Sequence, residues 1–373
     1  MPRRERRVLV PTMKGNIEFR VRVPGRVCLF GEHSDYLGLD VISASIDRYI
    51  ELSVAPREDD VVTILYSDLD EKEHFSAESE AAYLKKRDYV RSAFNTIRRR
   101  GSRSLPGADI TVAGRIPIAA GLSSSSALTV GAILVFARLA GLHLTPDDVA
   151  RVAFQAEVLE FGESGGKQDH FTIAYGGIVH LDVGNDYRVT QLPAELSGLV
   201  IGNSGEQKED TVGDLAHLRG TIEEEYETIK ESIEEFDPRE TDLEKVQSSS
   251  SQAQTVPRRM AEATLQNRDL TARAKKLLSK KIPNSEKLGQ LIDDHHAILR
   301  DGLGRSTKKI ERMIRAAKTA GALGCKINGS GGGGTILAYA PGKEREVMDA
   351  IESASGTAFE VSVGQGASLT RVR

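Results

Sequence analysis

The chain has 373 residues, a formal net charge of −4 and 5% aromatic residues with no tryptophan. Its length suffices for two domains or one large domain with a sizeable core, and it has neither the cationic field nor the stacking side chains of a nucleic-acid binder. The two cysteines, Cys28 and Cys325, form no CxxC pair. This disfavours a disulfide scaffold or a structural zinc site and fits a reducing cytoplasm.

No segment predicts a membrane association. The basic residues 1–16 are not followed by an apolar run long enough for a signal peptide, so we expect a frayed end. The most apolar stretch, residues 127–144, contains Arg138 and follows a glycine-serine turn. It therefore predicts a core helix rather than a membrane span, and we expect a cytoplasmic protein.

The first half of the chain predicts strands with a few helices, which is an α+β pattern. Pro24-Gly25 predicts a bend in the first strand. Thr145 and Pro146 are typical of a helix cap and a first helical position. The expected strands are 16–30, 41–56, 59–68, 108–114 and 170–184, and the expected helices are 81–101, 126–139 and 146–162.

The second half predicts a helix-rich region that ends in a strand, a helix and a strand. A polar connection is expected at 247–255, and the domain boundary near 187–196, which gives domains 1–193 and 194–373. The expected helices are 221–236, 287–304, 306–324 and 344–356, and the expected strands lie within 325–341 and 358–366.

Four consecutive serines follow a glycine in the segment PIAAGLSSSSA, residues 117–127. A glycine and small polar residues before a helix favour an anion site, because the first helical turn has free N–H groups and a positive dipole end. The lysine of a Walker A loop is missing. A serine-rich cap on a core helix is the alternative interpretation.

Five of the seven residues in NGSGGGG, residues 328–334, are glycine. A dinucleotide-binding fingerprint would open a helix, whereas this run leads into the apolar segment TILAYA, which predicts a strand. The glycines therefore indicate a backbone that approaches a ligand closely or adopts positive φ. A flexible hairpin is the alternative.

Two further groups of polar residues are candidates for a site. The segment PGRVCLFGEHSDYLG, residues 24–38, combines charged and hydroxyl side chains that suit hydroxyl recognition, although it could also form an exposed charged loop. Glu157 lies on an otherwise apolar helical face, where a buried carboxylate needs a partner such as a metal ion or a salt bridge. Asp169 follows a glycine-rich turn.

Together, and in this order, these motifs resemble those of the GHMP kinase superfamily. PIAAGLSSSSA is similar to its phosphate-binding motif P-x-x-x-G-L-(S/G)-S-S-A, and CKINGSGGGG to its motif K-x-x-G-(A/S)-G-x-G-G. Within the superfamily, PGRVCLFGEHSDY most resembles the galactokinase signature P-G-R-V-N-L-I-G-E-H-T-D-Y. The resemblance extends from about residue 19 to residue 366.

The resemblance implies an α+β, two-domain GHMP kinase fold. Its N-terminal domain would be like domain 2 of ribosomal protein S5, its C-terminal domain would be ferredoxin-like, and the active site would lie in the cleft between them. The implied cofactors are ATP and Mg²⁺. The expected ATP-binding residues are Pro117, Gly121, Leu122, Ser123, Ser124, Ser125, Ser126, Gly329 and Gly331.

The remaining site residues follow from the same resemblance. Ser125 and Glu157 match the metal ligands, Asp169 matches the proposed general base, and Arg26 matches the arginine beside that base. The expected substrate-binding residues are Glu32, His33, Asp35, Gly166 and Asp169.

The implied activity is phosphorylation of a sugar hydroxyl by ATP, and we expect the anomeric C1 hydroxyl of galactose or a related sugar. Leu215 stands where galactokinases have a tyrosine that packs on the sugar, which leaves the identity of the sugar open. The alternatives are another GHMP kinase with a mevalonate-like or polyol substrate, a non-catalytic sugar sensor, and a diphosphomevalonate decarboxylase. The sequence gives no oligomeric state.

Overall fold

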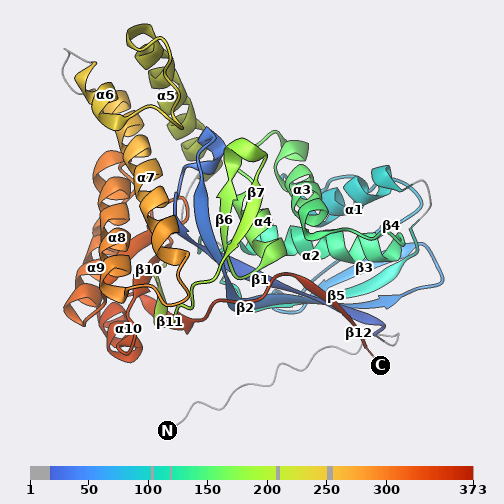
Figure 1. Ribbon diagram of the computed structural model, residues 1–373. Helices are drawn as coiled ribbons and strands as arrows, with labels where there is room; N and C mark the ends of the chain where they lie inside the picture. Colours follow the sequence, from blue (N-terminus) through green and yellow to red (C-terminus); the bar gives the residue numbers. More distant parts are fainter. Residues whose placement is uncertain (1–16, 102–104, 118–119, 207–210, 250–254, 373) are drawn as a thin grey trace.

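The computed structural model describes residues 17–101, 105–117, 120–206, 211–249 and 255–372. The basic N-terminal stretch and the centre of the polar connection therefore lie outside the described residues. Two β-sheets with their covering helices form the molecule (Figure 1). Cys28 and Cys325 are both buried and free, and no helix in the described part is long and apolar enough to cross a membrane.

The larger sheet has eight strands, with a main path β12-β1-β2-β5-β3-β4 and with β6 on β2 and β7 on β6. Its register shifts where β1 passes Pro24 and Gly25, which is where the sequence predicts a bend. The strands are β1 Phe19–Phe30, β2 Val41–Pro56, β3 Val61–Tyr66, β4 Glu71–Ser76, β5 Ala108–Gly114, β6 Ile178–Asp182, β7 Arg188–Leu192 and β12 Ser368–Arg371.

Four helices lie along the larger sheet (Figure 1): α1 Tyr89–Arg100, α2 Ser124–Leu139, α3 Pro146–Glu157 and α4 Gln168–Tyr175. Gly131 lets α2 approach β1 and β2, since a Cβ there would lie 2.5 Å from the side chain of Leu52. The predicted cap of α3 is confirmed: Thr145 and Asp148 form a capping box, with Pro146 in the first turn.

The smaller sheet is antiparallel, with the order β11-β8-β10-β9. In chain order its elements run strand, helices, two strands, helix, strand, which confirms the expected ferredoxin-like arrangement. The strands are β8 Leu199–Asn203, β9 Gly324–Asn328, β10 Thr335–Tyr339 and β11 Thr357–Val361, and the helices are α5 Thr211–Ser232, α6 Leu243–Ser248, α7 Val256–Leu278, α8 Ser285–Ala297, α9 Lys308–Thr319 and α10 Glu344–Ser353.

Some expected elements are wrong in type or extent. Residues 170–175, expected as strand, belong to α4, because the alternating pattern begins only at Ile178. The expected helix 81–101 begins at Tyr89, after Asp88. The sequence analysis also missed the long helix α7, whose cap is Thr255.

The proposed division into 1–193 and 194–373 separates the strands of the two sheets with one exception. β12 lies in the second part of the chain and yet pairs with β1 of the larger sheet. The C-terminal segment therefore returns to the first domain, which a single cut in the sequence does not capture.

Candidate active site

A bidentate pair joins Arg26 of β1 to Asp169 in the first turn of α4. Arg26 Nε donates to Asp169 Oδ1 at 2.6 Å, and Nη2 donates to Oδ2 at 2.9 Å. Arg26 Nη1 also donates to the backbone oxygen of Gly121 at 2.7 Å. The planar guanidinium thus fixes the carboxylate to the serine-rich loop, residues 120–126.

The environment keeps Asp169 ionised. Burial alone would raise the pKa of this carboxyl, but the charge of Arg26 and the hydrogen bonds from Arg26 and Ser123 hold its pKa below the ordinary value. Ser123 Oγ donates to Asp169 Oδ2 at 2.5 Å. The carboxylate is thus an acceptor in place to receive a hydroxyl hydrogen.

The four serines differ in burial and in their position relative to α2. Ser123 has positive φ, and α2 begins at Ser124, two residues earlier than expected. The first intrahelical bond runs from Ala127 N–H to Ser123 O at 2.9 Å, so the preceding N–H groups are free to bind an anion. Ser124 and Ser125 are half-exposed, whereas Ser126 is buried.

The other described residues of the serine-rich loop hold the start of α2 in place. Pro117 is half-buried and Leu122 is buried, which anchors the loop in the core. Gly121 has positive φ, and a Cβ there would lie 2.9 Å from the backbone oxygen of Asn328. The loop is therefore packed directly against the glycine-rich turn of the smaller sheet.

Glu157, at the end of α3, is buried and held by two neighbours. Ser126 Oγ donates to Glu157 Oε1 at 3.1 Å, and His170 Nε2 lies 2.8 Å from Glu157 Oε2. These contacts place one carboxylate against Ser126, in the first turn of α2 that also contains Ser125. One carboxylate and one hydroxyl, completed by phosphate oxygens, are a donor set that suits Mg²⁺, so the residues present fit this ion.

The residues that flank the glycine-rich turn between β9 and β10 form hydrogen bonds with the serine-rich loop. The side-chain amide of Asn328 donates to Gly121 O at 2.8 Å, and its oxygen accepts from Cys28 N at 3.0 Å. Thr335 Oγ1 donates to Ala120 O at 2.7 Å. Gly329 and Gly331 both have positive φ. These bonds attach both ends of the turn to the serine-rich loop and to β1, which favours a held wall over a flexible hairpin.

Glu32 connects the first motif to this wall. Its carboxylate pairs with the ammonium of Lys326, which is completely buried, and accepts from the N–H of Gly329. Lys326 also donates to Cys28 O at 2.9 Å. In this arrangement Glu32 holds the glycine-rich turn, and any contact between Glu32 and a substrate would add to these bonds.

Asp35 and Gly166 lie in contact at the proposed substrate position. A Cβ on Gly166 would lie 1.7 Å from Asp35 Oδ2, so only glycine allows this approach. Asp35 Oδ2 accepts from the N–H of Gln168 at 3.0 Å. Burial raises the pKa of Asp35 to about 6. Beside it, His33 Nδ1 lies 2.9 Å from Tyr36 Oη.

The sequence analysis missed several residues that hold the site in place. Lys326 and Asn328 lie inside the motif CKINGSGGGG, but no function was predicted for them. A lysine within an apolar strand was the signal that could have indicated a buried ion pair. His170, which follows Asp169 directly in the sequence, was also not singled out, although its ring contacts Glu157. The adjacent histidines of α8, His295 and His296, contact Leu29 O and Glu311 respectively.

Known protein families match segments of the chain that belong to both sheets and their helices. Models described as "GHMP kinases N terminal domain" and "GHMP kinases C terminal" match residues 88–177 and 274–356, and a "Galactokinase galactose-binding signature" matches 12–56. A mevalonate kinase of Thermococcus onnurineus is 31% identical over 348 residues, covering 90% of this chain and 92% of that protein.

Two solved structures share the fold. The galactokinase of Lactococcus lactis, complexed with galactose, superposes with a TM-score of 0.84 at 22% identity and covers 95% of each chain. The mevalonate kinase of Methanococcus jannaschii gives a TM-score of 0.72 at 20% identity, covering 95% of this chain and 100% of that one. The chain belongs to the GHMP kinase family and is an ATP-dependent phosphotransferase.

Proposed function

We propose that the protein phosphorylates a hydroxyl of a neutral sugar, and that the acceptor is the anomeric C1 hydroxyl of galactose or a related sugar. The observation that carries this proposal is Asp35, a buried carboxylate against Gly166 within the segment that matches the galactose-binding signature. A carboxylate accepts hydroxyl hydrogens well and repels an anionic acceptor.

The charges around Asp35 support a neutral acceptor. Arg26 is paired with Asp169, and Lys326 is paired with Glu32. Within the described residues, no cationic nitrogen lies within 4.0 Å of the Asp35 carboxylate. An acceptor with its own carboxylate, such as mevalonate or a uronic acid, would therefore meet negative charge without a free cation among these residues.

In the proposed mechanism Asp169 accepts a hydrogen bond from the acceptor hydroxyl and orients its oxygen toward the γ-phosphorus of ATP. The new O–P bond forms as the bond to the β-γ bridging oxygen breaks, and the hydroxyl proton passes to Asp169. Because Arg26 keeps Asp169 weakly basic, proton transfer is expected late, when the attacking oxygen has already become acidic.

The phosphates would lie at the N-terminus of α2, against the free N–H groups of Ser124 to Ser126. Ser125 and Glu157 would hold Mg²⁺, which neutralises phosphate charge when bound. Gly329 and Gly331 would close the wall beside the phosphates. Their backbone is kept in place by Asn328 and Thr335.

A mevalonate kinase activity is the second candidate, because curated mevalonate kinases are 29–32% identical to the chain over almost its whole length. ATP turnover with Mg²⁺ against galactose, other hexoses, pentoses, cyclic polyols and mevalonate separates the two. Turnover on a neutral sugar is expected. Turnover on mevalonate alone would overturn the proposal, and sugar binding without any turnover would identify a sensor.

A further inference from the structure

A pocket of about 470 Å³ lies outside the candidate active site, between α7, the end of β6 and the segment that precedes α6. Its volume falls in the range of small-molecule sites. Its wall contains four cationic and two carboxylate side chains. The charged lining residues are Arg239, Arg268, Lys275, Lys276, Asp40 and Glu240.

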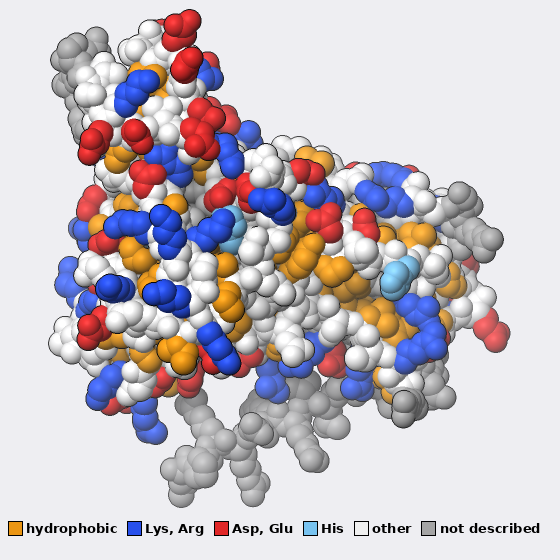
Figure 2. Space-filling model, in the orientation of Figure 1, with side chains coloured by type: hydrophobic (Ala, Val, Ile, Leu, Met, Phe, Trp, Pro, Cys, Tyr) orange, Lys and Arg blue, Asp and Glu red, His pale blue; other side chains and the backbone are white. Residues whose placement is uncertain are grey.

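The positive charge of this pocket is concentrated on a chain that is acidic overall. Figure 2 shows lysine and arginine side chains gathered over the region of α7 and α8, while acidic side chains gather on the projecting end that carries α5. The net charge of the whole chain is −4. Arg239 and Arg268 have carboxylate partners in Asp182 and Asp269, so it is chiefly the two lysines that favour an anionic ligand at this place.

The two arginines are already held by the protein. Arg239 Nη1 donates to Gly38 O at 2.9 Å, and its Nη2 donates to Asp182 Oδ1 at 3.3 Å. Arg268 Nη1 donates to Pro238 O at 2.9 Å and to Thr241 O at 2.8 Å. Their positions are thus fixed before a ligand arrives, which lowers the entropic cost of binding.

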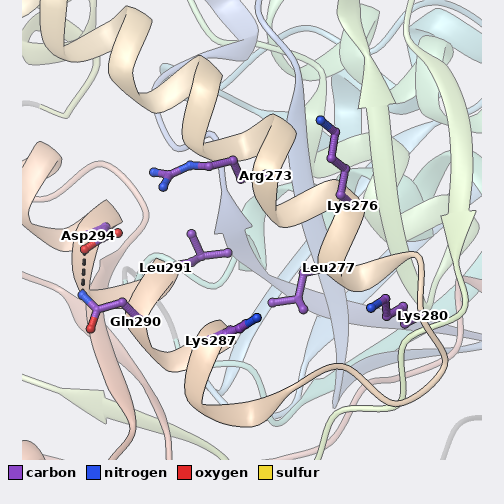
Figure 3. Close-up of a pocket in the computed structure, with 8 residues that line it drawn as sticks. All are labelled: Arg273, Lys276, Leu277, Lys280, Lys287, Gln290, Leu291 and Asp294. Carbon is purple, nitrogen blue, oxygen red and sulfur yellow. Dashed lines mark hydrogen bonds between the residues drawn. The ribbon is translucent and has the colours of Figure 1, made fainter.

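The two lysines are different, since neither Lys275 nor Lys276 has an anionic partner within 4.0 Å among the described residues. A neighbouring pocket of about 390 Å³ between α7 and α8 shares Lys276 (Figure 3). There the ammonium of Lys276 points to the top of the view, whereas the guanidinium of Arg273 points toward α8. Lys276 also lines the larger pocket, together with Lys275 and His180.

We propose that this pocket binds a phosphorylated sugar or polyol. Lys275, Lys276 and Arg268 would surround the phosphate, and Asp40 and Glu240 would accept hydroxyl hydrogens of the carbon skeleton. Asp40 is itself fixed, because its Oδ2 lies 3.0 Å from Nε2 of the buried His180. The wall therefore contains both cations, which suit a phosphate, and carboxylates, which suit hydroxyl groups.

The pocket is connected to the candidate substrate loop through α7. One helical turn before Thr271 of the pocket wall, Asn267 Nδ2 donates to Glu32 O at 2.9 Å and lies 3.2 Å from Ser34 Oγ. Arg239 holds Gly38 of the same loop. A ligand that fixes α7 and Arg239 is therefore expected to reduce the opening of residues 32–40.

The test measures binding by calorimetry at constant ionic strength, with a hexose 1-phosphate, a hexose 6-phosphate and inorganic phosphate as probes. The full chain is compared with Lys275→Ala/Lys276→Ala, with Lys85→Ala/Lys86→Ala as a control of equal charge change, and with Asp35→Asn, which alters the proposed sugar site. Hydrogen exchange of residues 32–40 is followed with and without the probe.

We expect hexose 6-phosphate, which is not the product of the proposed reaction, to bind at least about tenfold more weakly to Lys275→Ala/Lys276→Ala. It should bind equally to the wild type, Lys85→Ala/Lys86→Ala and Asp35→Asn. We also expect slower exchange at 32–40 only where the two lysines are present. Unchanged binding in Lys275→Ala/Lys276→Ala would overturn the proposal, as would an equal loss in both lysine variants.

Two outcomes distinguish the sources of the phosphate and the two sites. Inorganic phosphate that binds as tightly as the sugar phosphates would overturn the assignment of a sugar ligand. Loss of binding in Asp35→Asn, with none in Lys275→Ala/Lys276→Ala, would place the ligand in the catalytic site and refute the second pocket. Binding needs no turnover, so its failure is distinguishable from failure of the proposed kinase activity.

Discussion

Arg26 and Asp169 are 143 residues apart in the chain and share two parallel hydrogen bonds. Because Arg26 also holds Gly121 O at 2.7 Å, one side chain aligns the base of the proposed reaction with the loop proposed to hold ATP. The pair therefore links the position of the acceptor to the position of the phosphoryl donor.

Asp169→Asn is expected to keep ATP binding and to lose most turnover, on the order of 10²- to 10⁴-fold. The amide can no longer take the hydroxyl proton, although its shape still fits beside Arg26. Nucleotide titration and kcat measured on the same preparation provide the check. Asp186→Asn, an exposed change, is the control, and near-normal turnover in Asp169→Asn would refute the general-base function.

Ser125→Ala is expected to raise the Mg²⁺ concentration needed for half-maximal activity about tenfold. The hydroxyl lost is the proposed metal ligand, whereas Ser124→Ala removes a neighbouring half-exposed hydroxyl and should have a smaller effect. Binding of Mn²⁺ with ATP, followed by electron paramagnetic resonance, gives a readout apart from activity. Equal Mn²⁺ affinity in both variants would contradict the assignment of Ser125.

The KM for the acceptor is expected to rise as the pH falls from 7 to 5, with a midpoint near 6. Burial raises the pKa of Asp35 to about 6, so acidification protonates this carboxylate, whereas Asp169 stays ionised because its pKa is lowered. The value of kcat should change little over the same range. A KM that follows the same pH dependence in Asp35→Asn would count against this assignment.

Asp35→Asn is also expected to stabilise the protein without ligand at pH 7, by on the order of 2 kcal/mol. Between the ordinary pKa of 3.8 and about 6, the folded chain retains a proton that the unfolded chain releases. Asp35 therefore makes the folded state less stable as the pH rises through this window. Urea unfolding at pH 4 and pH 7 measures the difference in the free energy of unfolding between Asp35→Asn and the wild type. This difference should be small at pH 4.

Lys326→Met is expected to destabilise the protein by about 3–5 kcal/mol, because it leaves the carboxylate of Glu32 buried and unpaired. The double variant Lys326→Met/Glu32→Gln should recover much of this loss. Denaturant unfolding of both single variants and the double variant forms a complete cycle. Additive losses would show that the two groups do not form a coupled pair.

The sequence predicted the parts of the fold that depend on local signals. The cap formed by Thr145 and the bend at Pro24-Gly25 follow from short-range chemistry, and both are confirmed. Residues 170–175 were expected as strand because apolar residues dominate there, and a short buried helix has the same composition. Only the packing of α4 against α3 and the sheet decides between the two.

The site was predictable as a set of motifs but not as a set of contacts. Local sequence contains no sign that Ser123 bonds to Asp169 or that Ser126 bonds to Glu157, since each pair is more than 30 residues apart. Lys326 required the structure for the same reason: its partner Glu32 is 294 residues away. The two serine pairs depend on how α2, α3 and α4 pack together, and the pair of Lys326 and Glu32 depends on how the two sheets meet.

The pairing of β12 with β1 has a consequence for how the protein is made. β1 contains Arg26 near its end, and its first residues, Phe19 to Arg22, stay an open edge until residues 368–371 have been synthesised. Unpaired edges invite association between chains. A nascent chain that lacks residues 368–371 thus still exposes this edge, so newly made protein is expected to associate more readily until β12 pairs with β1.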